Sequence, residues 1–492
     1  MHIVIPMAGV GQRFIDAGYR EPKPLIKINN KMIIEHACDI FPLETKFTFI
    51  CNAKHLAETN MRDELLKIKP DANVIEIPNH TDGPVYTVLQ IADLIDDDEE
   101  IIINYCDFGI YWDYEDFLKH TRDRDADGAV ISYKKFHPHM FDSTNYAVST
   151  DHEQWMEEIK EKEPVDEAMS KYVSNGTYYF KKGSYVKKYF KELIDKKITH
   201  NDEYYVSLIY NLLVKENLKV SIYEIPHMLQ WGIPQDVERY NDWSNYFESL
   251  IQAKKKFPSK SNSLTVVSLL DDRLEFDKVG FKEYTTSKPF MEISGNPIFK
   301  QAIDSLPKSE KELFLVQEEH LSDKALKALL LDTYSNASVV SVDDEIILND
   351  IDKETQILFS SYDKSIVYDE EKYNLLVDDK KIDIIIFTFK GEEFGTYFIR
   401  NVDIFNSVSS KLGKQEFVSL LDSEHDFNVK QFEVERLIAW DTAYNYEAYI
   451  YWQSFFHKVE WHPYTLENDR SINKKKIKEL DKKFRSFKQD YR

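Results

Sequence analysis

The chain opens with MHIVIPMAGVGQRF, residues 1–14, which carries its clearest fold signal. Residues 2–5 are typical of a buried strand, and the strand leads into a glycine-containing loop. Glycines let a backbone approach a ligand closely, and successive N–H groups form a nest for an anion. The guanidinium of Arg13 adds donors that suit phosphate oxygens. We therefore predict a strand followed by a phosphate-binding loop formed by Ala8, Gly9, Val10, Gly11, Gln12 and Arg13.

More buried strands follow in the same part of the chain. Apolar runs at residues 47–51, 101–105 and 129–132 indicate strands, and residues 32–41 indicate a helix. Alternation of strands and helices at this spacing favours an α/β fold with a mainly parallel sheet. The acidic residues 96–100 precede a strand and are expected to form a solvated turn.

Composition limits the class of protein. The chain has 492 residues, enough for two large domains or about three of average size. Its formal charge of −23 argues against a general nucleic-acid binder, but a local basic pocket can still hold a nucleotide. The three cysteines have neither disulfide-framework nor zinc-site spacing. No apolar run reaches membrane-spanning length and the first residues do not resemble a signal peptide, so we expect a cytoplasmic protein.

A second motif lies ten residues after Arg13. Two prolines stiffen an extended segment around Lys23, whose charge could neutralise a phosphate. Taken alone, the glycine loop is equally explained by a tight turn and Lys23 by a surface loop. The loop also lacks the third glycine of a dinucleotide fingerprint and the Gly-Lys-Ser/Thr of a P-loop. Together, the two motifs are much more specific.

This pair of motifs resembles the signature of the sugar-1-phosphate nucleotidyltransferases, also called nucleotide-sugar pyrophosphorylases, with the first glycine run one residue shorter. The resemblance covers about residues 1–245. It implies a Rossmann-like, GT-A-like sheet and dependence on Mg²⁺ or Mn²⁺. The implied reaction joins an NTP to a sugar 1-phosphate, giving an NDP-sugar and pyrophosphate.

The resemblance also implies roles for individual residues. Asp107 ends a strand where the family places its metal-binding aspartate, and Lys162 lies in a modified sugar-binding motif. The implied catalytic residues are Arg13, Lys23 and Asp107, with Asp107 as the metal ligand. The implied nucleotide contacts are the loop residues 8–12 with Asp82 and Gly83, and the implied substrate contacts are Lys162, Asn175, Gly176 and Glu203.

One position departs from the family pattern. The family commonly has a second metal carboxylate where this chain has Gln230. Asp202, Glu203 or Asp236 could replace it, or the metal could rest on Asp107 and the phosphates alone. The absence of a Ser-His-Asp or Cys-His set is no objection, because a phosphate oxygen is already an anionic nucleophile at neutral pH.

The sequence beyond residue 262 repeats the first part faintly but in order. Lys23-Pro24 returns as Lys288-Pro289, Asp107 as Asp363, and Gly176 as Gly395. Trp231, Tyr240 and Trp243 return as Trp440, Tyr449 and Trp452. The glycine loop does not return, because residues 270–274 read Leu-Asp-Asp-Arg-Leu. We therefore expect a degenerate second copy of the same fold, with a structural, oligomeric or regulatory role.

These patterns divide the chain into four parts. We expect a catalytic domain at 1–250, a linker at 251–262 within the Lys-, Pro- and Ser-rich stretch 248–263, a degenerate domain at 263–465, and a basic C-terminal helix at 466–492. Apolar residues of that last stretch recur at helical spacing, which favours a helix docked on the acidic body over a contact with a membrane surface or polyanion.

Several functions stay open at this stage. The predicted partners are an NTP and a sugar 1-phosphate, and a homo-oligomer is compatible with the sequence. Cytidylyl transfer to a non-sugar phosphate such as phosphocholine is one alternative. Others are a GT-A-like glycosyltransferase, although residues 107–109 are not an Asp-x-Asp, and a non-catalytic sugar-nucleotide-binding protein. Residues 113–115, the nearest imitation of that motif, are expected to start a helix.

Overall fold

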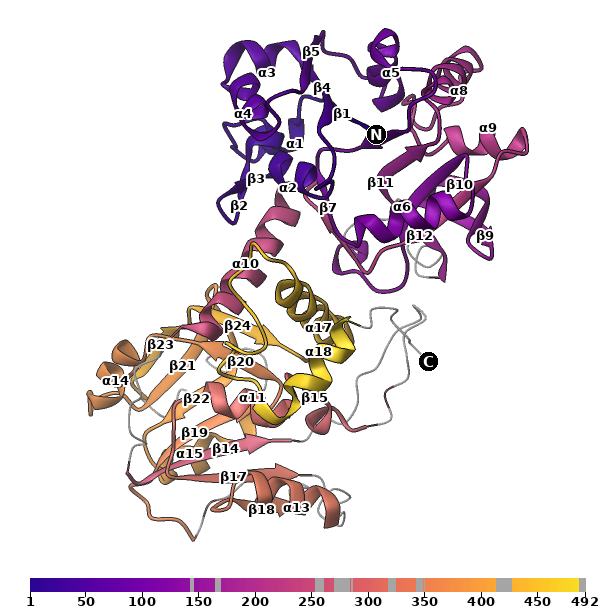
Figure 1. Ribbon diagram of the computed structural model, residues 1–492. Helices are drawn as coiled ribbons and strands as arrows, with labels where there is room; N and C mark the ends of the chain where they lie inside the picture. The colour runs from indigo at the N-terminus through magenta and orange to yellow at the C-terminus, as the bar shows by residue number, and fades with distance from the viewer. Residues whose placement is uncertain are drawn as a thin grey trace.

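The protein folds into two α/β halves joined through helix α10 (Pro234–Ile251), as Figure 1 shows. This computed structural model describes residues 1–141, 146–163, 170–252, 261–269, 284, 286–316, 324–341, 348, 350–412 and 427–485.

The first half contains a nine-stranded sheet. Strands β1, β4, β5 and β6 run parallel, and β11 runs antiparallel to both β6 and β8. The strands predicted at 2–5, 47–51, 101–105 and 129–132 are therefore confirmed as members of one mainly parallel sheet. Its order is β5 (Asn73–Ile77), β4 (Lys46–Asn52), β1 (His2–Met7), β6 (Ile101–Asn104), β11 (Tyr172–Phe180), β8 (Gly128–Tyr133), β12 (Val220–Glu224), β10 (Trp155–Glu163), β9 (Tyr146–His152).

Strand β1 lies at the centre of this half because its side chains are apolar on both faces. Ile3 and Ile5 pack into the core on one side of the sheet, and Val4 packs into the core on the other. Successive residues of a strand point to opposite faces, and parallel sheets are covered on both. A continuous apolar run therefore forms the strand that delivers the glycine loop.

Helices cover this sheet. Helix α2 (Ile33–Asp39) confirms the helix predicted at 32–41, and Asp113 caps helix α6 (Tyr114–Asp123) as expected. The other helices of the first half are α1 (Gln12–Asp16), α3 (Ala53–Glu58), α4 (Met61–Ile68), α5 (Pro84–Leu89), α8 (Gly183–Asp195) and α9 (Ile209–Lys215).

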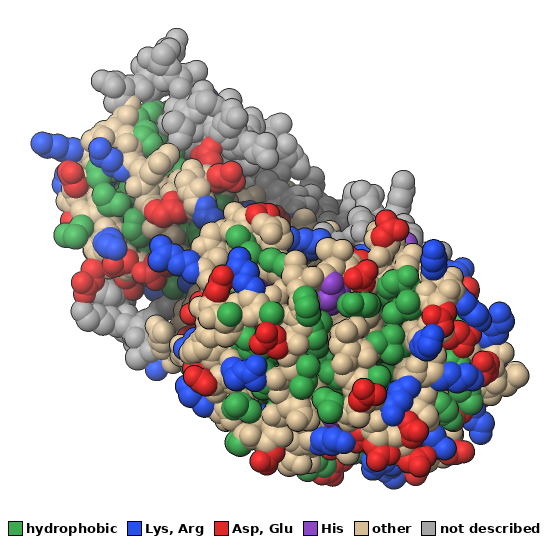
Figure 2. Space-filling view, turned by 90° about the horizontal axis from the view of Figure 1, so that it is seen from above, with side chains coloured by type: hydrophobic (Ala, Val, Ile, Leu, Met, Phe, Trp, Pro, Cys, Tyr) green, Lys and Arg blue, Asp and Glu red, His purple; other side chains and the backbone are tan. Residues whose placement is uncertain are grey.

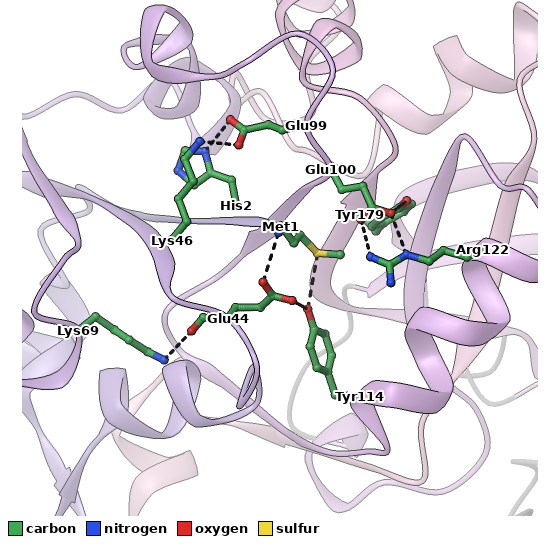
Figure 3. Close-up of polar contacts among 10 residues, drawn as sticks. All are labelled: Met1, His2, Glu44, Lys46, Lys69, Glu99, Glu100, Tyr114, Arg122 and Tyr179. Carbon is green, nitrogen blue, oxygen red and sulfur yellow. Dashed lines mark hydrogen bonds and ion pairs between the residues drawn. The ribbon is translucent and has the colours of Figure 1, made fainter.

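The acidic segment 96–100 forms the expected turn, but two of its carboxylates are only partly exposed and are paired. Glu99 accepts from Lys46 at 2.5 Å and contacts the ring of His2, while Glu100 pairs with Arg122 at 2.5 Å (Figure 3). The hydroxyl of Tyr179 also donates to Glu100. The expectation of a fully solvated turn is wrong here, because these carboxylates tie neighbouring strands and α6 together.

The second half has a seven-stranded sheet whose strand order and directions match those of the first sheet from β5 to β12, without counterparts of β10 and β9 among the described residues. Strands β17, β14 and β19 run parallel, and β22 runs antiparallel to β19 and β21, as β11 does to β6 and β8. Its order is β18 (Ser338–Ser341), β17 (Lys311–Val316), β14 (Ser263–Ser268), β19 (Gln356–Ser361), β22 (Glu392–Ile399), β21 (Ile384–Phe389), β23 (Val429–Glu433).

Smaller elements also occur in both halves. Strands β7 (Phe108–Tyr111) and β13 (His227–Gln230) form a two-stranded sheet, as do β20 (Lys364–Val367) and β24 (Arg436–Ala439). The short helices η1 (Lys23–Leu25) and η4 (Lys288–Phe290) begin at the repeated lysines. Two-stranded pairs follow them, β2 (Lys27–Ile28) with β3 (Lys31–Met32), and β15 (Glu292–Ile293) with β16 (Asn296–Pro297). The remaining helices here are α11 (Ile298–Ser305), α13 (Lys324–Thr333), α14 (Glu370–Asp378), α15 (Val402–Val408) and α17 (Ala443–Lys458).

Two predicted boundaries, those of the linker and of the C-terminal helix, differ from the structure. Residues 248–251, expected to begin a linker, are the last turn of α10. The basic C-terminal helix is α18 (Ile477–Arg485), and it docks through buried Leu480 and Phe484. The predicted start at 466 is wrong, because 466–473 form turns. Three predicted segments lie wholly or partly outside the described residues. They are the linker at 253–260, the residues 270–274 that replace the glycine loop, and the C-terminal helix beyond 485.

The described surface carries charges of both signs. Figure 2 shows basic and acidic side chains interspersed over the face it views, with no continuous basic stripe on its described part. Within the described ranges, no helix has the length and apolar character needed to cross a bilayer.

Candidate active site

A cleft of about 580 Å³ opens at the carboxyl ends of β1, β5 and β6. In open α/β sheets, ligands bind outside the carboxyl ends of the strands. The loops that follow these three strands supply most of the lining. The lining residues are Pro6, Met7, Ala8, Gly9, Val10, Gly11, Gln12, Lys23, Pro24, Asn79, His80, Thr81, Gly83, Pro84, Thr87, Tyr105, Cys106, Asp107, Glu203 and Tyr205.

The glycine loop exposes its backbone to this cleft. Gly11 has φ 72° and precedes α1, whose Phe14 is buried and anchors the turn. A side chain at Gly9 would meet nothing within 4 Å, so the space beside this backbone is open. Such an arrangement suits a phosphate approaching the N–H groups. Arg13 is exposed and is not among the lining residues.

Lys23 and Asp107 meet inside the cleft although they are 84 residues apart in sequence. The Lys23 ammonium donates to Oδ2 of Asp107 at 2.5 Å and to the carbonyl of Gly232 at 3.4 Å. Pro24 and Leu25 are buried beneath the lysine and hold η1 in place. The backbone of Asp107 is also fixed, because its carbonyl accepts from the amide of buried Trp231 at 2.9 Å.

A second loop borders the cleft on the side of β5. Nδ1 of His80 accepts from the amide of Asp82 at 3.2 Å, so its proton lies on Nε2, which is 2.9 Å from the hydroxyl of Thr87. Burial lowers the pKa of His80, and the neutral ring fits this pattern. Gly83 has φ 91°, and a Cβ there would lie 2.8 Å from the amide nitrogen of Tyr204. The loop therefore requires glycine at this position.

The opposite side of the cleft brings together residues from β10 and the segment after α8. The Lys162 ammonium lies 5.5 Å from the centre of the Tyr205 ring. Tyr205 hydrogen-bonds to Glu203, and burial with this carboxylate raises the pKa of the tyrosine. Ser207 donates to Glu161, whose pKa is raised by burial. Lys162 thus points toward a half-buried polar cluster beside the cleft.

The two predicted sugar contacts on β11 lie beneath this region. Asn175 is buried, and its side chain bonds to the amide and hydroxyl of Thr177. Gly176 has φ 89°, and a Cβ there would overlap the ring of Phe108 at 2.5 Å. Neither residue is among those lining the cleft.

The structure therefore places the predicted residues in two groups. Residues 8–12, Lys23, Gly83, Asp107 and Glu203 line one cleft, whereas Arg13, Asp82, Lys162, Asn175 and Gly176 lie outside its lining. Sequence reasoning missed Asn79, His80, Thr81, Thr87 and Tyr205. Asn79 to Thr81 lie just beyond the carboxyl end of β5, a parallel strand of the same sheet as β1, and a prediction of that strand could have identified them.

Of the carboxylates that could replace the missing metal ligand, Glu203 lines the cleft, where it hydrogen-bonds to Tyr205. Asp236 does not line the cleft, and its Oδ2 accepts from the amides of Gly232 and Ile233 and from the side chain of Gln230. It is a buried helix cap of α10, and burial raises its pKa. In the described ranges, no group of three or more His, Cys, Asp or Glu residues is arranged to hold a metal. Among the described residues, the carboxylates that line the cleft are those of Asp107 and Glu203.

The corresponding place in the second half keeps the contacts, but its lysine and aspartate, Lys288 and Asp363, are buried. Lys288 lies 3.4 Å from Asp363 and donates to the carbonyl of Asp441, and the amide of Trp440 donates to the carbonyl of Asp363. Lys364, the residue after Asp363, adds a second ammonium 3.0 Å from that carboxylate. Burial raises the pKa of Asp363, but the charges of Lys364 and Lys288 outweigh it and lower the pKa overall.

Residues 3–223 match the family model described as nucleotidyl transferase. This match confirms the resemblance seen in the sequence. A search of curated proteins found no match. Among solved structures, the chain is similar to the nucleoside-diphosphate-sugar pyrophosphorylase from Vibrio cholerae RC9, with 21% identity, 48% of this chain and 98% of that chain covered, and a TM-score of 0.42.

Two further solved structures have similar coverage. A putative glucose-1-phosphate thymidylyltransferase from Bacillus anthracis has 16% identity over 49% of this chain and 94% of that chain, with a TM-score of 0.40. A UDP-glucose pyrophosphorylase from Acinetobacter baumannii has 14% identity over 50% and 93%, with a TM-score of 0.39.

Proposed function

From the match of residues 3–223 to the nucleotidyl transferase family, we propose that the protein transfers NMP from an NTP to a sugar 1-phosphate or related phosphate. The products are an NDP-sugar, or its analogue, and pyrophosphate. The observation that carries the proposal is the Lys23–Asp107 contact, which lies beside an open glycine loop in a single cleft.

In this mechanism the chain positions two phosphate-bearing substrates and neutralises their charge. The amides of Gly9 to Gly11, with Arg13 close by, hold the β- and γ-phosphates that leave as pyrophosphate. Lys23 neutralises charge that grows at the α-phosphate, and Lys162 binds the acceptor phosphate. An oxygen of that phosphate forms the new bond to the α-phosphorus while the α–β bridging bond breaks. No general base is required, and the catalysis is largely positioning and electrostatics.

The residues present fit a divalent cation bound mainly by substrate. Mg²⁺ is commonly held by one or two carboxylates together with substrate phosphates, and Asp107 supplies one such carboxylate. Asp107 would help to hold a bound Mg²⁺, which would reduce the negative charge of the phosphates. Because Lys23 pairs with Asp107 here, we infer that its ammonium shifts from the carboxylate to phosphate when nucleotide binds.

The loop after β5 is proposed to contact the nucleobase. Asn79, His80 and Thr81 line the cleft, and the His80–Thr87 contact holds that loop in one conformation. The acceptor phosphate is proposed to enter from the side of Lys162 and Tyr205. With the base on the side of β5 and the acceptor on the side of Lys162, the α-phosphate is proposed to lie between them, near Lys23 and Asp107.

The test is a pyrophosphate-release screen of the four NTPs against a panel of sugar 1-phosphates and phospho-alcohols, with Mg²⁺ present. We expect one NTP and one acceptor class to give release that requires both substrates. Release with a phospho-alcohol and not a sugar phosphate would assign the acceptor to the non-sugar class. No release from any pair, by protein that binds NTP, would contradict the proposed reaction.

We also propose that residues 263–465 are a degenerate copy that does not turn over nucleotide, following a catalytic part at 1–250. Two features support this proposal, the matching strand order and the ammonium of Lys364 on the carboxylate equivalent to Asp107. Asp363 has two ammonium groups against it, those of Lys288 and Lys364, and so offers a metal less negative charge than Asp107, which pairs with Lys23.

A stoichiometry measurement on the full chain tests the degenerate copy. Calorimetric titration with NTP and Mg²⁺ should show one site per chain, and Asp363→Asn should leave pyrophosphate release unchanged. Two NTP sites per chain would overturn the proposal. So would the loss of release in an Asp363→Asn chain whose circular dichroism matches the wild type.

A further inference from the structure

Helix α17 of the second half contacts the first half directly. The hydroxyl of Tyr451 donates to the carbonyl of Met228 at 2.7 Å, and the hydroxyl of Ser454 lies 3.3 Å from Nε2 of His227. Both contacts are buried and both reach strand β13. The rings of Tyr451 and His227 also meet edge to face, with centroids 4.7 Å apart.

Strand β13 supports the catalytic residues. It pairs with β7 in a two-stranded sheet, with Met228 opposite Ile110. Strand β7 begins directly after Asp107, and β13 ends two residues before Gly232. The two acceptors of the Lys23 ammonium therefore sit at one end of this small sheet, where the amide of Trp231 also binds the Asp107 carbonyl.

A sheet of two strands needs outside support. An isolated pair of strands is marginally stable in water, and packing against a helix is one way to stabilise it. Among the described residues, β7 and β13 pair only with each other and not with the nine-stranded sheet. Helix α2 packs against β7 from the first half, and α17 adds hydrogen bonds to β13 from the second half, so the support comes from both halves.

The packing of the two halves is reciprocal, as in a symmetric dimer. Tyr240 of α10 contacts Trp452 of α17 with ring centroids 5.7 Å apart, and the equivalent pair, Trp243 and Tyr449, lies 6.1 Å apart. Exchange of the same contacts in both directions is the pattern of an isologous interface. Tyr240, Tyr449 and Trp452 are buried in one hydrophobic cluster that spans both halves. The support from α17 is therefore a permanent part of the core.

We propose that Tyr451 is a positioning residue for the reaction, acting through Met228 and the β13–β7 sheet on Asp107. The second half thus contributes to catalysis without touching substrate. This inference rests on the proposed function for its kinetic consequence, but the structural link from α17 to β13 is independent of which substrates are used.

The test compares two tyrosines of the same helix in the full chain. Tyr451→Phe removes the hydroxyl that reaches β13. Tyr446→Phe is the matched control, because its hydroxyl donates to a backbone carbonyl within its own half, that of Glu292, at 2.9 Å. We expect Tyr451→Phe to lower kcat roughly tenfold or more, since small misplacements of catalytic groups can cost up to about 10² in rate. It should also raise the Mg²⁺ concentration needed for half-maximal rate, whereas Tyr446→Phe should change neither.

Amide hydrogen exchange supplies a readout that does not depend on turnover. Residues 108–111 and 227–231 should exchange faster in Tyr451→Phe than in Tyr446→Phe. If Tyr451→Phe does not fold, Ser454→Ala removes a weaker contact to the same strand and should show the same pattern at smaller size. Wild-type kcat and wild-type exchange in both strands would overturn the inference. Faster exchange in a protein whose wild type releases no pyrophosphate would contradict the proposed function and retain the structural link.

Discussion

The ammonium of Lys23 and the carboxylate of Asp107 form an ion pair 2.5 Å long at the bottom of the cleft. Both side chains are 18% exposed, so the pair is accessible to a ligand yet partly shielded from water. The lysine follows β1 through the glycine loop, and the aspartate follows β6, the strand beside β1. A phosphate or a metal entering here meets an opposite charge already in place.

Replacing Lys23 with alanine should reduce pyrophosphate release by about 10²–10³, the usual cost of losing a donor that stabilises transition-state charge. The matched control is Lys27→Ala, an exposed lysine on the neighbouring β2 that should leave turnover unchanged. Circular dichroism checks that both variants fold. Normal release by Lys23→Ala would exclude its assigned role.

The Asp107→Asn variant should lose most activity and its normal response to Mg²⁺, because the amide removes the negative charge offered to the cation. Asp113→Asn changes the N-cap of α6 nearby and should retain turnover. Initial rates over a Mg²⁺ titration distinguish the two variants. Full activity of the wild type in excess chelator would contradict the metal assignment.

The Asp236→Ala variant should reduce stability without altering the Mg²⁺ response. Its Oδ2 accepts three hydrogen bonds at the start of α10, and loss of a cap typically costs about 1 kcal/mol. Denaturant unfolding measures the stability, and a Mg²⁺ titration of the rate measures the metal response. A raised Mg²⁺ requirement with unchanged stability would instead indicate that Asp236 substitutes for the family's second metal carboxylate.

Lys458 should make stability depend on pH. Burial, with a contribution from Arg485, lowers its pKa to about 6, far below the value in an unfolded chain. Between about pH 6 and 10 the unfolded chain then binds one more proton, so stability should rise with pH by up to about 1.4 kcal/mol per unit. Lys458→Met should flatten this slope and stabilise the protein at neutral pH.

Denaturant unfolding at several pH values between 6 and 9 tests this dependence. Lys482→Met, at an exposed position of the adjacent helix α18, is the control and should keep the wild-type slope. The same slope in wild type and Lys458→Met would show that other groups cause the dependence.

Local patterns predicted the main elements of the first half. The strand at 2–5, the loop from Ala8 to Gln12 and the helix near 32–41 depend on residues close together in sequence, and the structure has all three. The role of residues 96–100 was less predictable, because Glu99 and Glu100 find their partners on distant elements. Asn175 was predicted as a sugar contact, but the fold turns its side chain toward Thr177.

Apolar spacing and glycine position in the sequence were enough for the α/β class, the glycine loop and the repeated order of motifs, because each depends on the backbone preferences of neighbouring residues. The long-range contacts required the fold. They include the Lys23–Asp107 pair, the use of Asp236 as a cap, Lys364 beside Asp363, and Tyr451 on Met228. Each depends on where two distant segments cross and which way their side chains point, and no local propensity contains that information.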